Sequence, residues 1–170
     1  MKSFIKALSL LTVVGFFAAS CEKDLCKDVE TGTHGTCLEG IVTCNTGYEK
    51  NADGLCEIEW SAKFLGNLVA ASDTVTSGPN AGGPYTYNTT ISRVSEVKLT
   101  TTNFSGFGAS NVVEIDVISS TELSINYTDV AGRAFVGSGS ITNRTITLNY
   151  TVTFPSGGGT DNTQTIITLP

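Results

Sequence analysis

The chain has 170 residues and a formal net charge of −6, from ten basic and 16 acidic side chains. The basic residues are not clustered. This disfavours binding to nucleic acid and electrostatic docking on anionic lipid, because both need grouped Lys and Arg. The acidity mainly favours solubility.

Residues 1–20 are typical of a secretory signal peptide. Lys2 and Lys6 form a short positive segment, and Ala7–Ala19 forms an apolar segment of 13 residues. A spanning helix needs about 20 apolar residues, so this segment is too short to cross a bilayer and has the length of a signal core. We therefore expect residues 1–20 to direct export and to be removed.

The segment Ala18-Ala19-Ser20-Cys21 resembles the lipobox of bacterial lipoproteins, although that family most often has Leu where Ala18 stands. In the family, the signal is cut just before the cysteine, whose thiol and amine are then acylated. The resemblance implies a lipidated Cys21 and a tether over residues 21–25. Two or more acyl chains anchor a protein stably without a spanning segment. The alternative is an ordinary secreted protein that is cut near Ala19.

Directly after this cysteine, Glu22-Lys23-Asp24 resembles the signal by which one Gram-negative phylum sends lipoproteins to the outer face of the outer membrane. This resemblance implies display on the cell surface, with retention on the periplasmic face as the alternative. In both cases the first partner of the protein is a membrane, contacted through the lipid on Cys21.

All five cysteines precede residue 57. An exported chain meets an oxidising compartment, where cysteines usually pair, and an odd count leaves one over. Lipidation of Cys21 accounts for the odd cysteine. The remaining four permit three pairings; they are Cys26, Cys37, Cys44 and Cys56.

Residues 26–56 resemble an EGF-like module through His34-Gly35-Thr36-Cys37, through Cys44-x-x-Gly47-Tyr48 and through a turn over residues 51–54 before Cys56. The family joins six cysteines first to third, second to fourth and fifth to sixth. The four cysteines here stand at the first, third, fifth and sixth places, so the two missing ones are partners of each other. The resemblance implies the disulfides Cys26–Cys37 and Cys44–Cys56, which would staple a segment with almost no apolar core.

We expect no metal and no other cofactor. Only Glu22 and Asp24 precede Cys26, so the calcium-binding pattern of some EGF-like modules is not matched. His34 is the single histidine, and no Cys-x-x-Cys pair of the kind common in structural zinc sites accompanies it. We therefore expect His34 to be a turn residue of the module.

Residues 57–170 have the pattern of an all-β domain, with short alternating runs separated by turn residues. The clearest strand is 145–154, in which every second residue from Ile146 to Phe154 is apolar and the others are Thr or Asn. Such alternation places one face on a core and the other in water. Further strands are expected at 67–76, 85–92, 94–102, 113–117, 123–127, 133–141 and 163–169.

Turn-forming residues predict loops at 77–84, 104–108 and 155–159. About eight short strands with short connections favour an antiparallel meander, closed as a barrel or folded as a sandwich, and no long helix. The segment 60–66, which begins with Trp60, faintly resembles the opening of lipocalin-like barrels, although Ile58 stands where that family has Gly.

The residues present disfavour an enzyme. The β domain contains no His and no Cys, so its plentiful Ser and Thr have no partner base. Glu114 and Asp116 share one face of a strand and could resemble a catalytic carboxylate pair. They lie opposite the apolar residues of that strand, however, so we expect them to face solvent. Gly106-x-Gly108 and Gly137-x-Gly139 are not phosphate loops, because those need a strand-to-helix transition.

Two functions are consistent with these features. The first is a surface-anchored interaction module, in which the EGF-like unit is a spacer and the loops 77–84 and 155–161 face an unknown protein or glycan. The alternative is a lipocalin-like carrier of a small apolar ligand, held inside an eight-stranded barrel. The aromatic residues that could line such an interior are Tyr85, Tyr87, Phe104, Phe107, Tyr127 and Phe135.

Asp73-Thr74-Val75 resembles the short acceptor motif for O-glycosylation in the same phylum as the export signal. If Thr74 is modified, the protein isolated from a related host has a mass above that of its chain, and Thr74→Ala removes this increment. Intact-protein mass spectrometry measures the difference. Identical mass increments in the two proteins would exclude Thr74 as the site.

Overall fold

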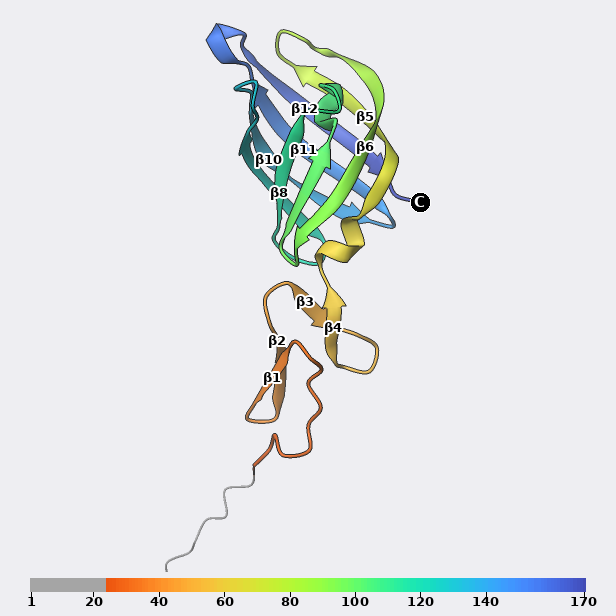
Figure 1. Cartoon of the computed structure of the whole chain (residues 1–170), viewed down its shortest axis with the longest axis vertical. Helices are drawn as coiled ribbons and strands as arrows, with labels where there is room; N and C mark the ends of the chain where they lie inside the picture. The colour runs from red at the N-terminus through yellow and green to blue at the C-terminus, as the bar shows by residue number, and fades with distance from the viewer. Residues whose placement is uncertain (1–23) are drawn as a thin grey trace, which may run out of the picture.

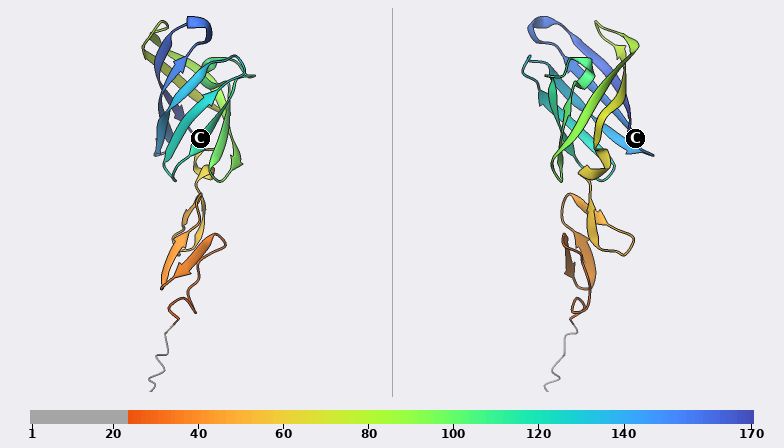
Figure 2. Two further views of the ribbon diagram at one scale, coloured as in Figure 1. Left: turned by 90° about the vertical axis from the view of Figure 1, so that its left-hand side faces the viewer. Right: turned by 45° about the vertical axis from the view of Figure 1, so that its right-hand side comes forward.

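The computed structural model describes residues 24–170, so the expected signal peptide and Cys21 lie outside the described residues. The described chain forms a closed β-barrel at the end of a narrow stalk, residues 24–59, built from two small hairpins (Figures 1 and 2). The expected fold class, a small disulfide-stapled unit followed by an eight-stranded antiparallel meander, is confirmed. Of the two closures that the sequence allowed, the barrel is the one observed.

The stalk consists of two antiparallel strand pairs. The first joins β1 (Gly35–Leu38) to β2 (Ile41–Cys44), and the second joins β3 (Tyr48–Lys50) to β4 (Cys56–Glu59). The hairpin β3–β4 therefore continues three residues past the last cysteine.

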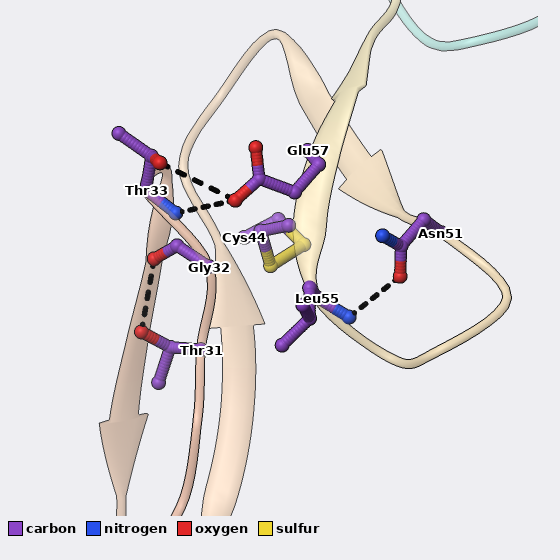
Figure 3. Close-up of a disulfide and its surroundings, with 8 residues drawn as sticks. Thr31, Gly32, Thr33, Cys44, Asn51, Leu55 and Glu57 are labelled. Atoms are coloured by element: carbon purple, nitrogen blue, oxygen red, sulfur yellow. Dashed lines mark hydrogen bonds between the residues drawn. A yellow bond between two sulfur atoms is a disulfide. The ribbon is translucent and has the colours of Figure 1, made fainter.

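Two disulfides hold the stalk, and they join the pairs that the EGF-like resemblance implies. Cys26–Cys37 and Cys44–Cys56 span 11 and 12 residues along the sequence, and Figure 3 shows the disulfide of Cys44. In the chain-entropy model, a loop of this size stabilises the fold by roughly 2–3 kcal/mol. Cys56 is the one buried apolar residue of the stalk's described part, so the crosslinks replace the core that this unit lacks.

Local polar contacts complete the stalk. The expected turn over 51–54 is present, and the side-chain oxygen of Asn51 accepts hydrogen bonds from the backbone N–H groups of Asp53 and Leu55, both at 3.0 Å. The backbone N–H of Thr33 donates to Glu57 at 2.8 Å (Figure 3). His34 lies in a turn, as expected, and its ring stacks on Tyr48 with the ring centres 3.6 Å apart.

The barrel is an up-and-down meander in which each strand pairs with the next and the last strand pairs with the first. Three 3₁₀ turns interrupt the connections. The elements are η1 (Ser61–Phe64), β5 (Gly66–Ser77), β6 (Gly82–Ser95), β7 (Lys98–Thr102), η2 (Phe104–Gly106), β8 (Val112–Val117), β9 (Glu122–Thr128), β10 (Ala134–Thr142), β11 (Thr145–Thr153), η3 (Pro155–Gly157) and β12 (Thr160–Thr168).

The apolar core fills the barrel interior, as the alternation predicts. In β11 the inward residues from Ile146 to Val152 are buried, while the residues between them are exposed or half-buried. At the end nearest the stalk, Phe64 of η1 is fully buried and Trp60 packs against the same core. The segment that resembles a lipocalin entry therefore closes this end of the barrel.

Some strand boundaries predicted from the sequence are wrong; β12, for example, begins at Thr160 and not at residue 163. The two strands expected at 85–92 and 94–102 are separated not near residue 93 but at residues 96–97, because β6 continues to Ser95. Arg93 lies within β6. In the structure its side chain lies beyond the apolar core and forms an ion pair with Glu59 of the stalk. The expected loop 77–84 is also shorter, since β6 begins at Gly82.

The stalk meets the barrel through backbone as well as charged contacts. The backbone N–H of Trp60 donates to the carbonyl of Gly47 at 2.8 Å, and Lys63 forms an ion pair with Glu49. A Cβ atom on Gly47 would lie 2.4 Å from the side chain of Glu96 in the β6–β7 turn, so only glycine permits this close approach. Within residues 24–170 no helix has the length and apolarity needed to cross a membrane.

Gly137, on the inner face of β10, makes room for β11. A Cβ atom there would lie 2.2 Å from the carbonyl oxygen of Asn149 and 2.5 Å from the Cα atom of Tyr150. We expect Gly137→Ala to lower the free energy of unfolding by about 1–3 kcal/mol, because the added methyl group overpacks the interior. Urea denaturation measures this loss. The control Ser138→Ala lies on the exposed outer face and should change the value by less than about 0.5 kcal/mol; equal losses in both variants would contradict the steric explanation.

Candidate functional site

The end of the barrel away from the stalk is formed by four connections and is called the mouth here. The meander places every second connection at this end, namely residues 78–81, 103–111, 129–133 and 154–159 (Figure 1). The two loops that the sequence suggested as contact surfaces, 77–84 and 155–161, both reach the mouth.

A cavity of about 240 Å³ opens at the mouth. Its lining combines two buried acidic residues, three aromatic rings and several small side chains, and it contains no Lys or Arg. The lining residues are Asp73, Val75, Asn80, Tyr85, Ser105, Phe107, Val152, Phe154, Asp161 and Thr163.

Asp73, on the inner face of β5, lies at the bottom of this cavity and is only 3% exposed. Its Oδ1 atom accepts hydrogen bonds from the hydroxyls of Tyr87 (2.9 Å) and Thr165 (2.6 Å). Its Oδ2 atom accepts one from Ser105 (2.7 Å), and the Tyr150 hydroxyl lies 3.4 Å away. Four neutral hydroxyls from four different elements thus surround one carboxylate.

The neighbouring tyrosines respond to this charge. Burial raises the pKa of the Tyr87 phenol, and the negative charge of Asp73 raises it further. The pKa of Tyr150 is also raised, first by burial and then by Asp73. Both phenols therefore stay protonated, and Tyr87 remains available as a donor to the carboxylate.

Ser105 belongs to the connection 103–111, which folds into the barrel. Its backbone has φ 57° and ψ 23°, a left-handed conformation rare outside glycine. Two contacts hold it there, since its N–H donates to the Tyr87 oxygen at 3.1 Å and its hydroxyl donates to Asp73. The preceding Phe104 is 1% exposed and packs on the rings of Phe135 and Tyr150, so it closes the barrel interior below the cavity.

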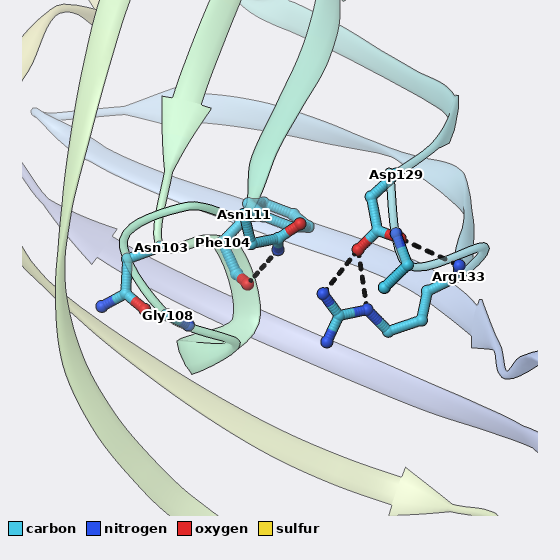
Figure 4. A network of polar contacts seen from close by, with 7 residues as sticks. Asn103, Phe104, Gly108, Asn111, Asp129 and Arg133 are labelled. Atoms are coloured by element: carbon cyan, nitrogen blue, oxygen red, sulfur yellow. Dashed lines mark hydrogen bonds and ion pairs between the residues drawn. The ribbon is translucent and has the colours of Figure 1, made fainter.

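Side chains of the same connection fix its path (Figure 4). The side-chain oxygen of Asn103 accepts from the N–H of Gly108 at 2.8 Å, and the Asn111 amide donates to the carbonyl of Phe104 at 2.9 Å. Asn111 is 2% exposed, and its Oδ1 atom has no hydrogen-bond partner among the described residues.

Asp161, on the inner face of β12, is the second buried acid of the cavity and is 3% exposed. It accepts hydrogen bonds from the backbone N–H of Asn80 (3.1 Å) and from the Asn80 amide (2.8 Å). These contacts hold the β5–β6 connection over the mouth. A Cβ atom on Gly78 would lie 2.3 Å from the Asp161 carboxylate, so the turn needs glycine at this place.

Beside the cavity, Asp129 and Arg133 form a nearly buried ion pair, with Nη2 of Arg133 2.6 Å from Oδ2 of Asp129 (Figure 4). Burial by itself would raise the pKa of Asp129, but the hydrogen bonds and charge of Arg133 outweigh it and lower the pKa. The guanidinium carbon also lies 4.0 Å from the centre of the Phe107 ring. One cation at the mouth is thus held between a carboxylate and an aromatic face.

Larger hollows on the outer wall are shallow. One of about 480 Å³ runs along β9, β10 and β11 and is lined mostly by small polar residues such as Ser124, Ser138 and Thr147. It lacks both the buried charges and the aromatic rings of the mouth. The mouth cavity is therefore the better candidate site.

The residues singled out in the sequence fall into three groups. Of the six aromatic residues expected to line an interior cavity, Phe104 and Phe135 are core, Tyr87 and Tyr127 pack against the core, and Tyr85 and Phe107 line the mouth. Glu114 and Asp116 lie on the outer wall and contact Lys98. Thr74 is exposed on the outer face of β5, so its glycosylation stays a prediction.

Sequence reasoning missed the two acids of the cavity. Asp73 belongs to the predicted glycosylation motif and Asp161 to the predicted contact loop 155–161, and neither acid is predicted to be buried or to line a site. One signal could have identified them. Along β5 and β12 the apolar alternation places Asp73 in phase with Val69 and Ala71, and Asp161 in phase with Ile167. An acid in phase with the core is buried, and burial calls for compensating partners.

No protein-family model matches the chain, and no curated protein matches it. A crystal structure described as a "putative outer membrane protein" from Bacteroides fragilis is similar to 67% of this chain, at 17% sequence identity and a TM-score of 0.37. The match spans 55% of that protein, about half of its length. At this level the similarity adds nothing to the fold seen directly.

The mouth combines acidic, aromatic and hydroxyl groups in one cavity. Within residues 24–170 no three His, Cys, Asp or Glu side chains come together in a way that could hold a metal ion. The hydroxyls of Ser105 and Thr165 donate to the Asp73 carboxylate, and the residues that line the cavity include no His or Lys. The cavity presents a ligand with acidic side chains, aromatic rings and a floor that the barrel core closes.

The raised pKa values of Tyr87 and Tyr150 predict alkaline behaviour. The folded-state pKa of each lies above the value of about 10 for free tyrosine. The resulting stabilisation is complete below about pH 10 and is lost as the pH rises toward the folded-state values. In an absorbance titration of phenolate, we expect these two signals to appear only as the protein unfolds. Tyr87→Phe and Tyr150→Phe should each remove amplitude from this late step; a loss from an earlier, reversible step would contradict the buried network.

Proposed function

We propose that this protein is an exported, lipid-anchored bacterial binding protein whose barrel mouth takes up a ligand without catalysing a reaction. The observation that carries the proposal is the position of the mouth cavity. It lies at the end of the molecule farthest from residue 24, whereas the lipobox-like segment ends at Cys21 (Figure 1). Anchoring through the N-terminus would therefore turn the mouth away from the membrane.

The stalk supports an anchor at its free end. Leu25 is 54% exposed, and at the tip of the β1–β2 hairpin Leu38 and Ile41 are 75% and 67% exposed. A Cβ atom on Gly40, in the same turn, would lie 3.3 Å from Leu25, so these residues are close together. This apolar tip, which begins at Leu25, four residues after the proposed lipid site, can rest on the bilayer while the rest of the surface stays in water.

The packing of the barrel favours a binding module over a carrier of an apolar ligand. Phe104, Phe135 and Tyr150 meet in the interior and are almost fully buried, so side chains occupy the space that a lipocalin-like carrier would leave for its ligand. The cavity that exists is small and partly acidic. In a binding module, the group that enters the mouth is a small free molecule or a part of a larger protein or glycan.

The anchor has a direct test. We expect the natural chain to take up radiolabelled palmitate and to sediment with membranes, and Cys21→Ser to abolish the label and release the protein. The matched control is the double variant Cys26→Ser, Cys37→Ser, which removes two cysteines of the stalk and should keep the label. A natural chain that is soluble and unlabelled after export would overturn the anchored part of the proposal.

Protease treatment of the same cells determines on which face of the outer membrane the protein is held. If it is displayed on the surface, protease added to intact cells removes the barrel domain, and removal depends on an intact Cys21. Complete protection in intact cells, with digestion after lysis, would instead assign the protein to the periplasmic face.

A further inference from the structure

We propose that the mouth cavity binds a small organic cation, an ammonium or guanidinium group carried on a compact molecule. This inference rests on the proposed function, because it names the ligand class of the same site.

The cavity contains two buried acids that have no cationic partner among the described residues. Asp73 and Asp161 each expose 3% of their surface, and both line the cavity. Within the described chain the ion pairs involve other acids, and the partners of these two are hydroxyl, amide and backbone N–H groups. Neutral donors stabilise a buried carboxylate but do not neutralise it. A cation in the cavity would supply the missing charge in a region of low dielectric constant.

Aromatic rings form part of the cavity wall. Tyr85, Phe107 and Phe154 line the cavity together with the acids, and a ring face attracts a cation within about 6 Å. The mouth already contains one such arrangement, because the guanidinium of Arg133 lies between the Asp129 carboxylate and the Phe107 ring. A ligand cation between Asp161 or Asp73 and the free aromatic surface would repeat it.

Size and donor chemistry narrow the ligand further. The cavity of about 240 Å³ is smaller than typical ligand pockets, which hold roughly 300–1,000 Å³, so the guest is compact. The two acids do not form a common chelating cluster within the described residues. An inorganic ion would therefore gain few ligands, whereas an organic cation also gains the aromatic and aliphatic lining.

The test compares probes that differ in charge alone. The exported full chain carrying Cys21→Ser is titrated with choline and with its uncharged isostere 3,3-dimethylbutan-1-ol, within a panel of small cationic, neutral and anionic fragments. Amide resonances of Asn80, Ser105 and Phe107 report on the mouth in two-dimensional NMR spectra. We expect cationic fragments to shift these resonances, and choline to bind at least tenfold more tightly than the alcohol.

Variants then assign the charge. Asp161→Asn and Asp73→Asn should each weaken binding of the cationic fragments roughly tenfold or more, the size of a charge-assisted contact. The control Asp116→Asn makes the same charge change on the outer wall and should leave binding unaltered. If Asp73→Asn does not fold, Asp161→Asn and the choline pair decide the question.

The outcomes separate the two proposals. Neutral or anionic fragments that bind the mouth as well as cations do, or binding that Asp161→Asn leaves unchanged, would overturn the inference and keep the mouth as a binding site. If no fragment of any charge shifts the mouth resonances, both the inference and the assignment of the mouth fail.

Discussion

Asp73 places a carboxylate inside a closed barrel, where it has lost most of its water, and the described chain gives it hydroxyl donors in place of a cation. The donors come from β6, η2, β11 and β12, so the charge can be satisfied only when these elements have assembled around β5. Leaving a buried carboxylate short of donors costs several kcal/mol. The network therefore selects the one arrangement in which Ser105 adopts its left-handed backbone conformation and Phe104 enters the core. The cavity above is a consequence of this arrangement.

The two halves of the barrel interior are built differently. Near the stalk the core is apolar and is closed by Phe64. An apolar core of this kind follows from an alternating sequence, and its side chains do not each need one specific partner. Toward the mouth the interior becomes polar, with Asp73, Thr163 and Thr165 in positions that apolar side chains fill elsewhere. Polar interiors are demanding, since every donor and acceptor must be matched. Such a costly arrangement at the open end of a domain, beside a cavity, is more consistent with a binding site than with a stability device.

Most of the fold could be predicted from the sequence because period-two alternation and turn residues are local signals. The strand that contains Ile146 and Val152 could be predicted from its own alternation, without knowing which strands pair with it. Closure of the barrel depends on pairing between β5 and β12, about 90 residues apart, and no local pattern encodes it. The polar network could not be predicted from the sequence for the same reason, because the donors to Asp73 are distant from it along the chain. The strand boundary near Arg93 shows the same limit: the predicted strand ends at residue 92, whereas β6 continues to Ser95 and Arg93 forms an ion pair with the distant Glu59.

The stalk holds the barrel, and with it the mouth, in a fixed direction. A flexible tether would let the barrel lie on the membrane with its mouth in any direction. Here two disulfides stiffen the hairpins, and the Trp60 to Gly47 hydrogen bond and the close approach of Glu96 to Gly47 fix the last hairpin against the barrel. Ion pairs at the junction add little energy individually, because they are exposed, but they restrict rotation about the linker. A rigid stalk matters for function only if the barrel has to point in one direction. The mouth cavity is the feature of the barrel that such a stalk would orient.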